Sequence, residues 1–71
     1  MLSPNPTKRA RDLRVGDEII HRTRTLRIAS INAYPEPYAP GGFAVIIRTF
    51  DGTTLPGTWE TIYTLPLIAA A

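Results

Sequence analysis

The side chains that could carry out catalysis are few in this sequence. Histidine occurs once, at His21, cysteine is absent, and the six carboxylates are scattered without the spacing of metal ligands. Asp17 and Glu18 are adjacent, but successive residues of a strand point to opposite faces, so they cannot act as a carboxylate pair. We therefore expect no enzymatic activity, no metal and no cofactor. His21 is expected to be a half-buried residue at the end of the fold rather than a catalytic base.

Basic residues are concentrated in one part of the chain. Seven of the eight lie between positions 8 and 27, where three acidic residues leave a net charge of +4, whereas residues 28–71 carry −2. Affinity for nucleic acid begins with clustered lysine and arginine side chains, because they neutralise phosphates. The alternative is an ordinary solvated basic surface. The candidate nucleic-acid-binding residues are Arg22, Arg24, Arg27, Lys8, Arg9 and Arg11.

Aromatic residues give a second candidate surface, this one for a protein partner. Tyr34 and Tyr38 bracket a proline-rich segment, Phe43 begins an apolar run, and Trp59 follows a Gly-Thr pair. Such side chains can hold a peptide or stack on bases. The other interpretation is that Trp59 fills the core of a small domain and that the tyrosines pack on neighbouring prolines.

The composition predicts one folded domain. The 71 residues are 44% hydrophobic and 20% charged with a net charge of +2, which is unlike a disordered chain. A chain of this length builds a single core. No segment has the length of a membrane span, and residues 1–6 lack the order of a signal peptide. We expect a cytoplasmic protein with no membrane partner.

Short apolar runs separated by glycine and proline predict an all-β fold with five strands. Residues 10–13 have room for one helical turn at most, before a turn at Gly16-Asp17. A change in the phase of alternation near Ala29-Ser30 indicates a bulge, and Asp51-Gly52 predicts a hairpin turn with positive φ. A stiff loop is expected at 34–42. The strands are expected at 18–22, from about 26 to 33, at 43–50, at 53–59 with an interruption at Pro56-Gly57, and at 61–65.

The first two strands are expected to form a hairpin with Thr23-Arg24 at its tip. This register pairs His21 with Leu26 and sends Arg22 and Arg27 to the outer face, with Arg24 projecting from the tip. The core would then receive Ile19, His21, Leu26 and Ile28.

The strand from Phe43 to Phe50 is apolar on both faces from Phe43 to Ile47. Such a strand is either covered on both sides within a closed barrel or covered by a partner, including a second copy of the chain. We therefore also consider a homo-oligomer.

The segment Asp12-Leu13-Arg14-Val15-Gly16-Asp17-Glu18-Ile19 resembles the opening of SH3-like small β-barrels, including KOW modules and barrel domains of translation proteins. The region 10–65 also resembles small uncharacterised proteins of GC-rich bacteria and their phages. The resemblance implies a five-stranded SH3-like barrel over residues 10–66, between a flexible basic arm at 1–9 and a tail at 67–71.

Two functions remain open from the sequence. The first is a non-catalytic binding or regulatory module that engages nucleic acid through the basic hairpin and arm. The alternative is a protein–protein interaction module, such as a phage-type effector that binds a host protein or a self-assembling subunit. Ionic strength distinguishes them, because phosphate contacts weaken steeply with salt and apolar interfaces do not.

Overall fold

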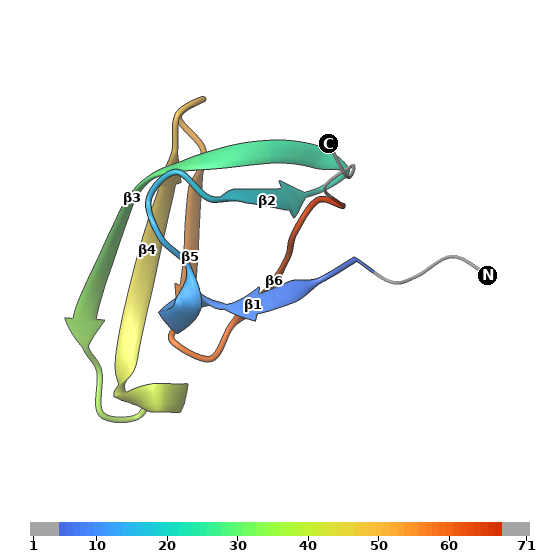
Figure 1. The fold of residues 1–71 in the computed structure, drawn as a ribbon. Coiled ribbons are helices and arrows are strands. Elements are labelled where there is room, and N and C mark those ends of the chain that lie inside the picture. Colours follow the sequence, from blue (N-terminus) through green and yellow to red (C-terminus); the bar gives the residue numbers. More distant parts are fainter. Residues whose placement is uncertain (1–4, 68–71) are drawn as a thin grey trace.

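The computed structural model describes residues 5–67 and contains six strands and two short 3₁₀ turns (Figure 1). All neighbouring strands are antiparallel and form one sheet in the order β1-β6-β2-β3-β4-β5. In the described residues β1 and β5 do not pair with each other, so the sheet is open. The elements are β1 (Thr7–Arg9), η1 (Ala10–Asp12), β2 (Glu18–His21), β3 (Arg24–Pro35), η2 (Pro40–Gly42), β4 (Phe43–Thr49), β5 (Thr54–Thr58) and β6 (Ile62–Thr64).

The all-β prediction is confirmed, and the number of strands is six instead of five. The additional strand is β1, in the segment predicted as an arm without secondary structure. It pairs with β6, and the ladder is extended by Leu65 N–H donating to the Pro6 carbonyl and Ala10 N–H to the Thr61 carbonyl, both at 2.8 Å. The arm prediction is therefore wrong for Thr7–Arg9. Residues 1–4 of the predicted arm and 68–71 of the predicted tail lie outside the described residues.

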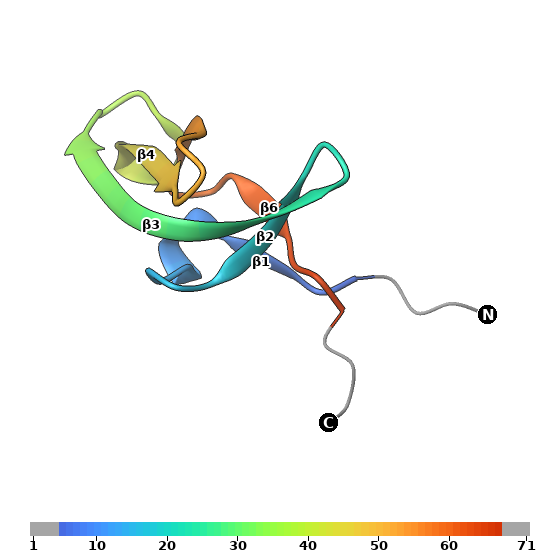
Figure 2. The same ribbon diagram turned by 90° about the horizontal axis from the view of Figure 1, so that it is seen from above.

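The long strand β3 divides the sheet into two leaves. Its first part pairs with β2, its second part pairs with β4, and the register shifts between Ile28 and Ser30, where the sequence predicted a bulge. The strand curves through this region (Figure 2). We call β1, β6, β2 and the start of β3 the first leaf, and the end of β3 with β4 and β5 the second leaf.

The core lies between the two leaves. Both Ile19 of β2 and Ile28 of β3 are fully buried, as are Val45 and Ile47 of β4. Burying each such side chain contributes about 1.5–3 kcal/mol relative to leaving it exposed. The segment with room for at most one helical turn forms the single 3₁₀ turn η1, where buried Ala10 adds to this core. The other buried apolar residues are Leu13, Leu26 and Leu55.

The β2–β3 hairpin differs in register from the prediction. Its tip is Arg22-Thr23, both with positive φ (50° and 66°), so that Ile19 pairs with Leu26 and His21 with Arg24. This is the two-residue turn whose twist matches the flanking strands, although each non-glycine residue there costs roughly 1–2 kcal/mol. The shift is by two residues, so the predicted core-facing side chains of Ile19 and Leu26 keep their face, and Arg24 moves from the tip into β3.

A second difference concerns β5, which runs without interruption through Pro56 and Gly57. The predicted break is wrong because β5 is an edge strand, where a residue without an N–H group can face the unpaired side.

β6 meets β2 at a single residue pair, Ile20 and Thr64, and the two strands diverge beyond it (Figure 2). None of the helical segments in the described part of the chain is long and apolar enough to cross a membrane.

The turn between β4 and β5 requires a positive φ at Gly52, and substitutions there test this requirement. Gly52 has φ +92°, its N–H donates to the Thr49 carbonyl at 3.0 Å, and no atom lies within 4 Å of where a Cβ would stand. Replacing Gly52 with valine should lower the free energy of unfolding by about 1–2 kcal/mol through backbone strain alone. The Gly52→Asn variant should lose less, because asparagine tolerates this conformation. Urea denaturation measures both, and equal midpoints for Gly52→Val and the parent would contradict the turn geometry.

Candidate functional site

The outer face of the first leaf carries a row of four side chains, one from each of its four strands, and three of them are threonines. Thr7 lies opposite Thr64, Thr64 opposite Ile20, and Ile20 opposite Thr25. Directly opposed residues share a face, and the neighbouring Ile19 is buried, so these four side chains point away from the core. We call Thr7, Thr64, Ile20 and Thr25 the threonine row. At strand spacings of about 4.8 Å it extends over roughly 14 Å.

Two arginines lie on the same face as the threonine row. Arg9 is two residues beyond Thr7 on β1, and Arg27 is two residues beyond Thr25 on β3; both are exposed. Glu18 lies opposite Arg27 on this face. Guanidinium groups and threonine hydroxyls both donate hydrogen bonds to phosphate oxygens. The face therefore combines two kinds of phosphate donor with two nearby carboxylates, since Asp12 lines the same shallow groove as Thr7 and Arg9.

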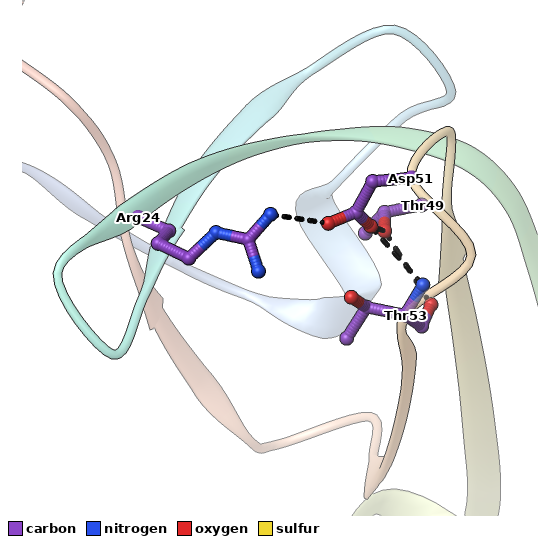
Figure 3. Close-up of polar contacts among 4 residues, drawn as sticks. All are labelled: Arg24, Thr49, Asp51 and Thr53. Atoms are coloured by element: carbon purple, nitrogen blue, oxygen red, sulfur yellow. Dashed lines mark hydrogen bonds and ion pairs between the residues drawn. The ribbon is translucent and has the colours of Figure 1, made fainter.

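Arg24 is not available to this face, because it is engaged on the other side of the hairpin. Its Nη2 lies 2.8 Å from Asp51 Oδ2 in the β4–β5 turn (Figure 3). Asp51 also accepts hydrogen bonds from Thr49 Oγ1 and from the Thr53 N–H group at 3.1 Å. We call Arg24, Thr49, Asp51 and Thr53 the Asp51 network. It ties the start of β3 to the end of the second leaf, so the prediction that Arg24 projects from the hairpin tip is wrong.

The Asp51 network stabilises the ionised carboxylate. The Thr49 hydroxyl contributes most, followed by the backbone and side chain of Thr53, and the Arg24 charge adds a smaller effect; together they lower the pKa of Asp51 from 3.8 to about 2. Each of these groups favours the charged form, so Asp51 stays ionised throughout the physiological range.

Arg11 is also paired within the fold. Its Nη2 lies 3.0 Å from Glu60 Oε2, and its N–H donates to the Trp59 carbonyl at 3.2 Å. Glu60 Oε2 is buried and accepts no hydrogen bond. Its contact with Arg11 is therefore an ion pair without hydrogen-bond geometry. Arg11 thus anchors η1 to the turn before β6.

The other predicted basic residues differ in their surroundings. Arg22 is exposed in the hairpin turn. Lys8 lies opposite Tyr63 on β6. It also lines two shallow grooves beside β1; Asp12 lines one of them, and Asp17 and Glu18 line the other. Of the six predicted residues, the structure brings Arg9 and Arg27 onto one face and pairs two with carboxylates.

The four aromatic residues of the alternative site do not share one surface. Tyr34 and Phe43 come from β3 and β4, and the pairing of Tyr34 with Ala44 places it on the outer face of the second leaf, opposite to Phe43. Phe43 packs on Trp59 with ring centres 5.9 Å apart, and Trp59 packs against the core. Tyr38 lies in the loop after β3 and is 97% exposed.

The structure places His21 at the end of β2, opposite Arg24 and partly exposed. Among residues 5–67 no three His, Cys, Asp or Glu side chains are grouped closely enough to hold a metal ion. The threonine row has no signal in the sequence, because β1 and β6 are three residues long and too short to show alternation.

Acid titration tests the Asp51 network. Because the folded pKa of about 2 lies below the unfolded value of 3.8, the ionised carboxylate stabilises the fold above about pH 4, and this contribution is lost as the pH falls toward 2. The melting temperature of Asp51→Asn should be lower than that of the parent at pH 7 and should fall less between pH 4 and pH 2. Thr49→Val removes the hydrogen bond that lowers the pKa of Asp51 most, so in this variant the loss of stability on acidification should be complete at a higher pH than in the parent. If the melting temperatures of the parent and of Asp51→Asn fell by the same amount between pH 4 and pH 2, the Asp51 network would be contradicted.

Comparison of the chain with protein-family models, with curated proteins and with solved structures found no match. No function is carried over from a relative. The candidate site is therefore defined by its own geometry, which is the threonine row with Arg9 and Arg27 beside it.

Proposed function

We propose that this chain is a non-catalytic module that binds nucleic acid through the outer face of the first leaf. The observation that carries the proposal is the threonine row with Arg9 and Arg27 on the same exposed face. The guanidinium groups would bind phosphates, the hydroxyl groups would donate to phosphate oxygens, and Arg22 in the adjacent turn would add a third cation.

The face favours contact with the backbone of the nucleic acid over reading of its bases. Ile20 lies in the row and Ile62, 63% exposed, lies beside it; these apolar side chains suit contact with sugars. No aromatic residue belongs to the row, so base stacking has no platform there. Binding should therefore be weak and largely independent of sequence.

The proposed architecture is an SH3-like small barrel, and the bent sheet supports it. β3 is shared by both leaves, and the strands β6-β2-β3-β4-β5 are neighbours in that order around the core. β1 adds a further strand beside β6 and thereby extends the outer face on which Arg9 lies.

The Asp51 network removes one arginine from the proposed interface. Arg24 pairs with Asp51 on one face of β3, whereas Thr25 and Arg27 point to solvent on the other face, because the buried Leu26 and Ile28 alternate with them. Arg24 itself is charge-paired and is not part of the proposed interface.

Salt dependence with a charge-matched control tests the proposal. Three phosphate contacts predict a slope of log affinity against log salt of roughly −2 to −3. The double variant Arg9→Glu with Arg27→Glu should lose most of the binding to labelled single-stranded RNA or duplex DNA, measured by fluorescence anisotropy. Arg14→Glu with Arg48→Glu changes the net charge equally at exposed positions outside the face and should keep the slope.

Arg14→Glu with Arg48→Glu should change the melting temperature little, because exposed substitutions alter stability by about 0.5 kcal/mol or less. Arg27→Glu places a carboxylate opposite Glu18 and should lower the melting temperature somewhat, so circular dichroism at the assay temperature checks that both double variants are folded. Equal losses in the two variants would show a diffuse charge effect rather than a site. If the parent has no salt-sensitive affinity for DNA or RNA, the proposal fails and the protein-interaction alternative gains support.

A further inference from the structure

The sheet has an unpaired side at the end of β3. After the bulge, β3 pairs only with β4, so the opposite side of Ile31–Pro35 has no backbone partner within the described part of the chain. This side of the second leaf is open in Figure 1, where nothing lies beyond β3. We call the unpaired side of Ile31–Pro35 the β3 edge. Its residues from Asn32 onward are exposed.

The hydrogen-bond phase identifies the groups at the β3 edge. Glu36 N–H donates to the Gly42 carbonyl at 2.9 Å, two residues beyond the pair Tyr34–Ala44. Alternation along an antiparallel ladder then directs the N–H and C=O groups of Tyr34 and Asn32 toward β4, and those of Ile31 and Ala33 away from it. The bonds from Thr49 to Thr53 and from Trp59 to Phe43 assign the odd-numbered residues of β4 to β5, which agrees with this phase.

The other two edges do not offer the same template. On β5, the outward-facing residues are Thr54, Pro56 and Thr58; Pro56 has no N–H group and the Thr58 N–H is already donated to Thr61 Oγ1 at 2.9 Å. On β1 the exposed side chains include Lys8 and Arg9, which would repel a second copy in direct pairing.

We propose that two copies of the chain associate through the β3 edge, by antiparallel pairing about a twofold axis at Asn32. Ile31 of each copy would lie opposite the partner's Ala33, and each such pair exchanges two hydrogen bonds. Four hydrogen bonds then use every N–H and C=O group that Ile31 and Ala33 direct outward. The β3 edge carries no charged residue, so the pairing brings no like charges together.

The association would stop at two copies. The joined second leaves form a continuous sheet in the order β5-β4-β3, then the partner's β3-β4-β5. Both outer edges of that sheet are β5, which is blocked at Pro56 and Thr58. An isologous contact that leaves only blocked edges gives a closed dimer instead of a filament.

Cysteine crosslinking tests the register, because the chain has no cysteine of its own. The two Asn32 residues would face each other in a non-hydrogen-bonded pair, with Cα atoms about 4.5 Å apart, within the range that a disulfide spans. Asn32→Cys should therefore form a disulfide-linked dimer rapidly with oxidised glutathione. In the matched control Tyr34→Cys the two thiols would be displaced by four residues, about 13 Å, and should crosslink far more slowly.

Sedimentation velocity over a range of concentrations tests the association itself. The parent should show a reversible dimer, and Ala33→Lys should weaken it at least tenfold, since the two introduced charges lie within the pairing. Thr54→Lys places the same charge on the blocked β5 edge and should leave the dimer unchanged; circular dichroism confirms that each variant is folded.

A parent that remains monomeric at about millimolar concentration would overturn the proposal, as would equal crosslinking of Asn32→Cys and Tyr34→Cys. The β3 edge lies on the second leaf, away from Arg9 and the threonine row. Failure of dimerisation and failure of nucleic-acid binding are therefore separate results.

Discussion

The bend of β3 is the constraint on which the rest of the fold depends. One continuous strand pairs with β2 at its start and with β4 at its end, and the shift between Ile28 and Ser30 lets it change partner. The two leaves thereby close over the fully buried side chains of Ile19, Ile28 and Ile47. The same bend releases one side of β3 from β2, so core formation and the unpaired β3 edge have a single origin.

The arginines of this small domain divide into structural and exposed groups. Arg24 and Arg11 are each paired with a carboxylate that is distant in sequence, Asp51 and Glu60, and so connect separate parts of the fold. Partly exposed ion pairs of this kind contribute about 0–1 kcal/mol each to stability, so strand pairing and the buried core fix these parts of the fold and the ion pairs only add to them. The arginines left on the outer face are the ones that can meet a partner.

Local signals in the sequence predicted the fold well where one residue type determines the backbone. The bulge at Ala29-Ser30 followed from the phase of alternation, and the positive φ of Gly52 followed from the Asp-Gly pair. The position of the hairpin tip could not be predicted, because Arg22 and Thr23 are poor residues for positive φ and the turn is fixed by the pairing of its strands.

The candidate site was predictable only in part, because its members come together through pairings between distant segments. The clustering of basic residues predicts Arg9 and Arg27 as candidates, yet it does not distinguish them from Arg24, whose partner Asp51 is 27 residues away. Thr7 and Thr64 meet through the pairing of β1 with β6, two strands too short to leave a pattern. Pro56 predicts a break in the strand from its local sequence, because the edge position that permits a proline is a property of the whole sheet.

The contrast between the two hairpin turns bears on the order of events during folding. The turn at Gly52 adopts its backbone angles cheaply, whereas the turn at Arg22-Thr23 places two side-chain-bearing residues in the left-handed region. We expect the β4–β5 hairpin to be formed in the folding transition state and the β2–β3 turn to be completed afterwards, when Arg24 reaches Asp51. The ratio of the change in folding activation free energy to the change in stability (the kinetic φ-value) should be near 1 for mutations around Gly52 and near 0 at Thr23, and the reverse pattern would exclude this order.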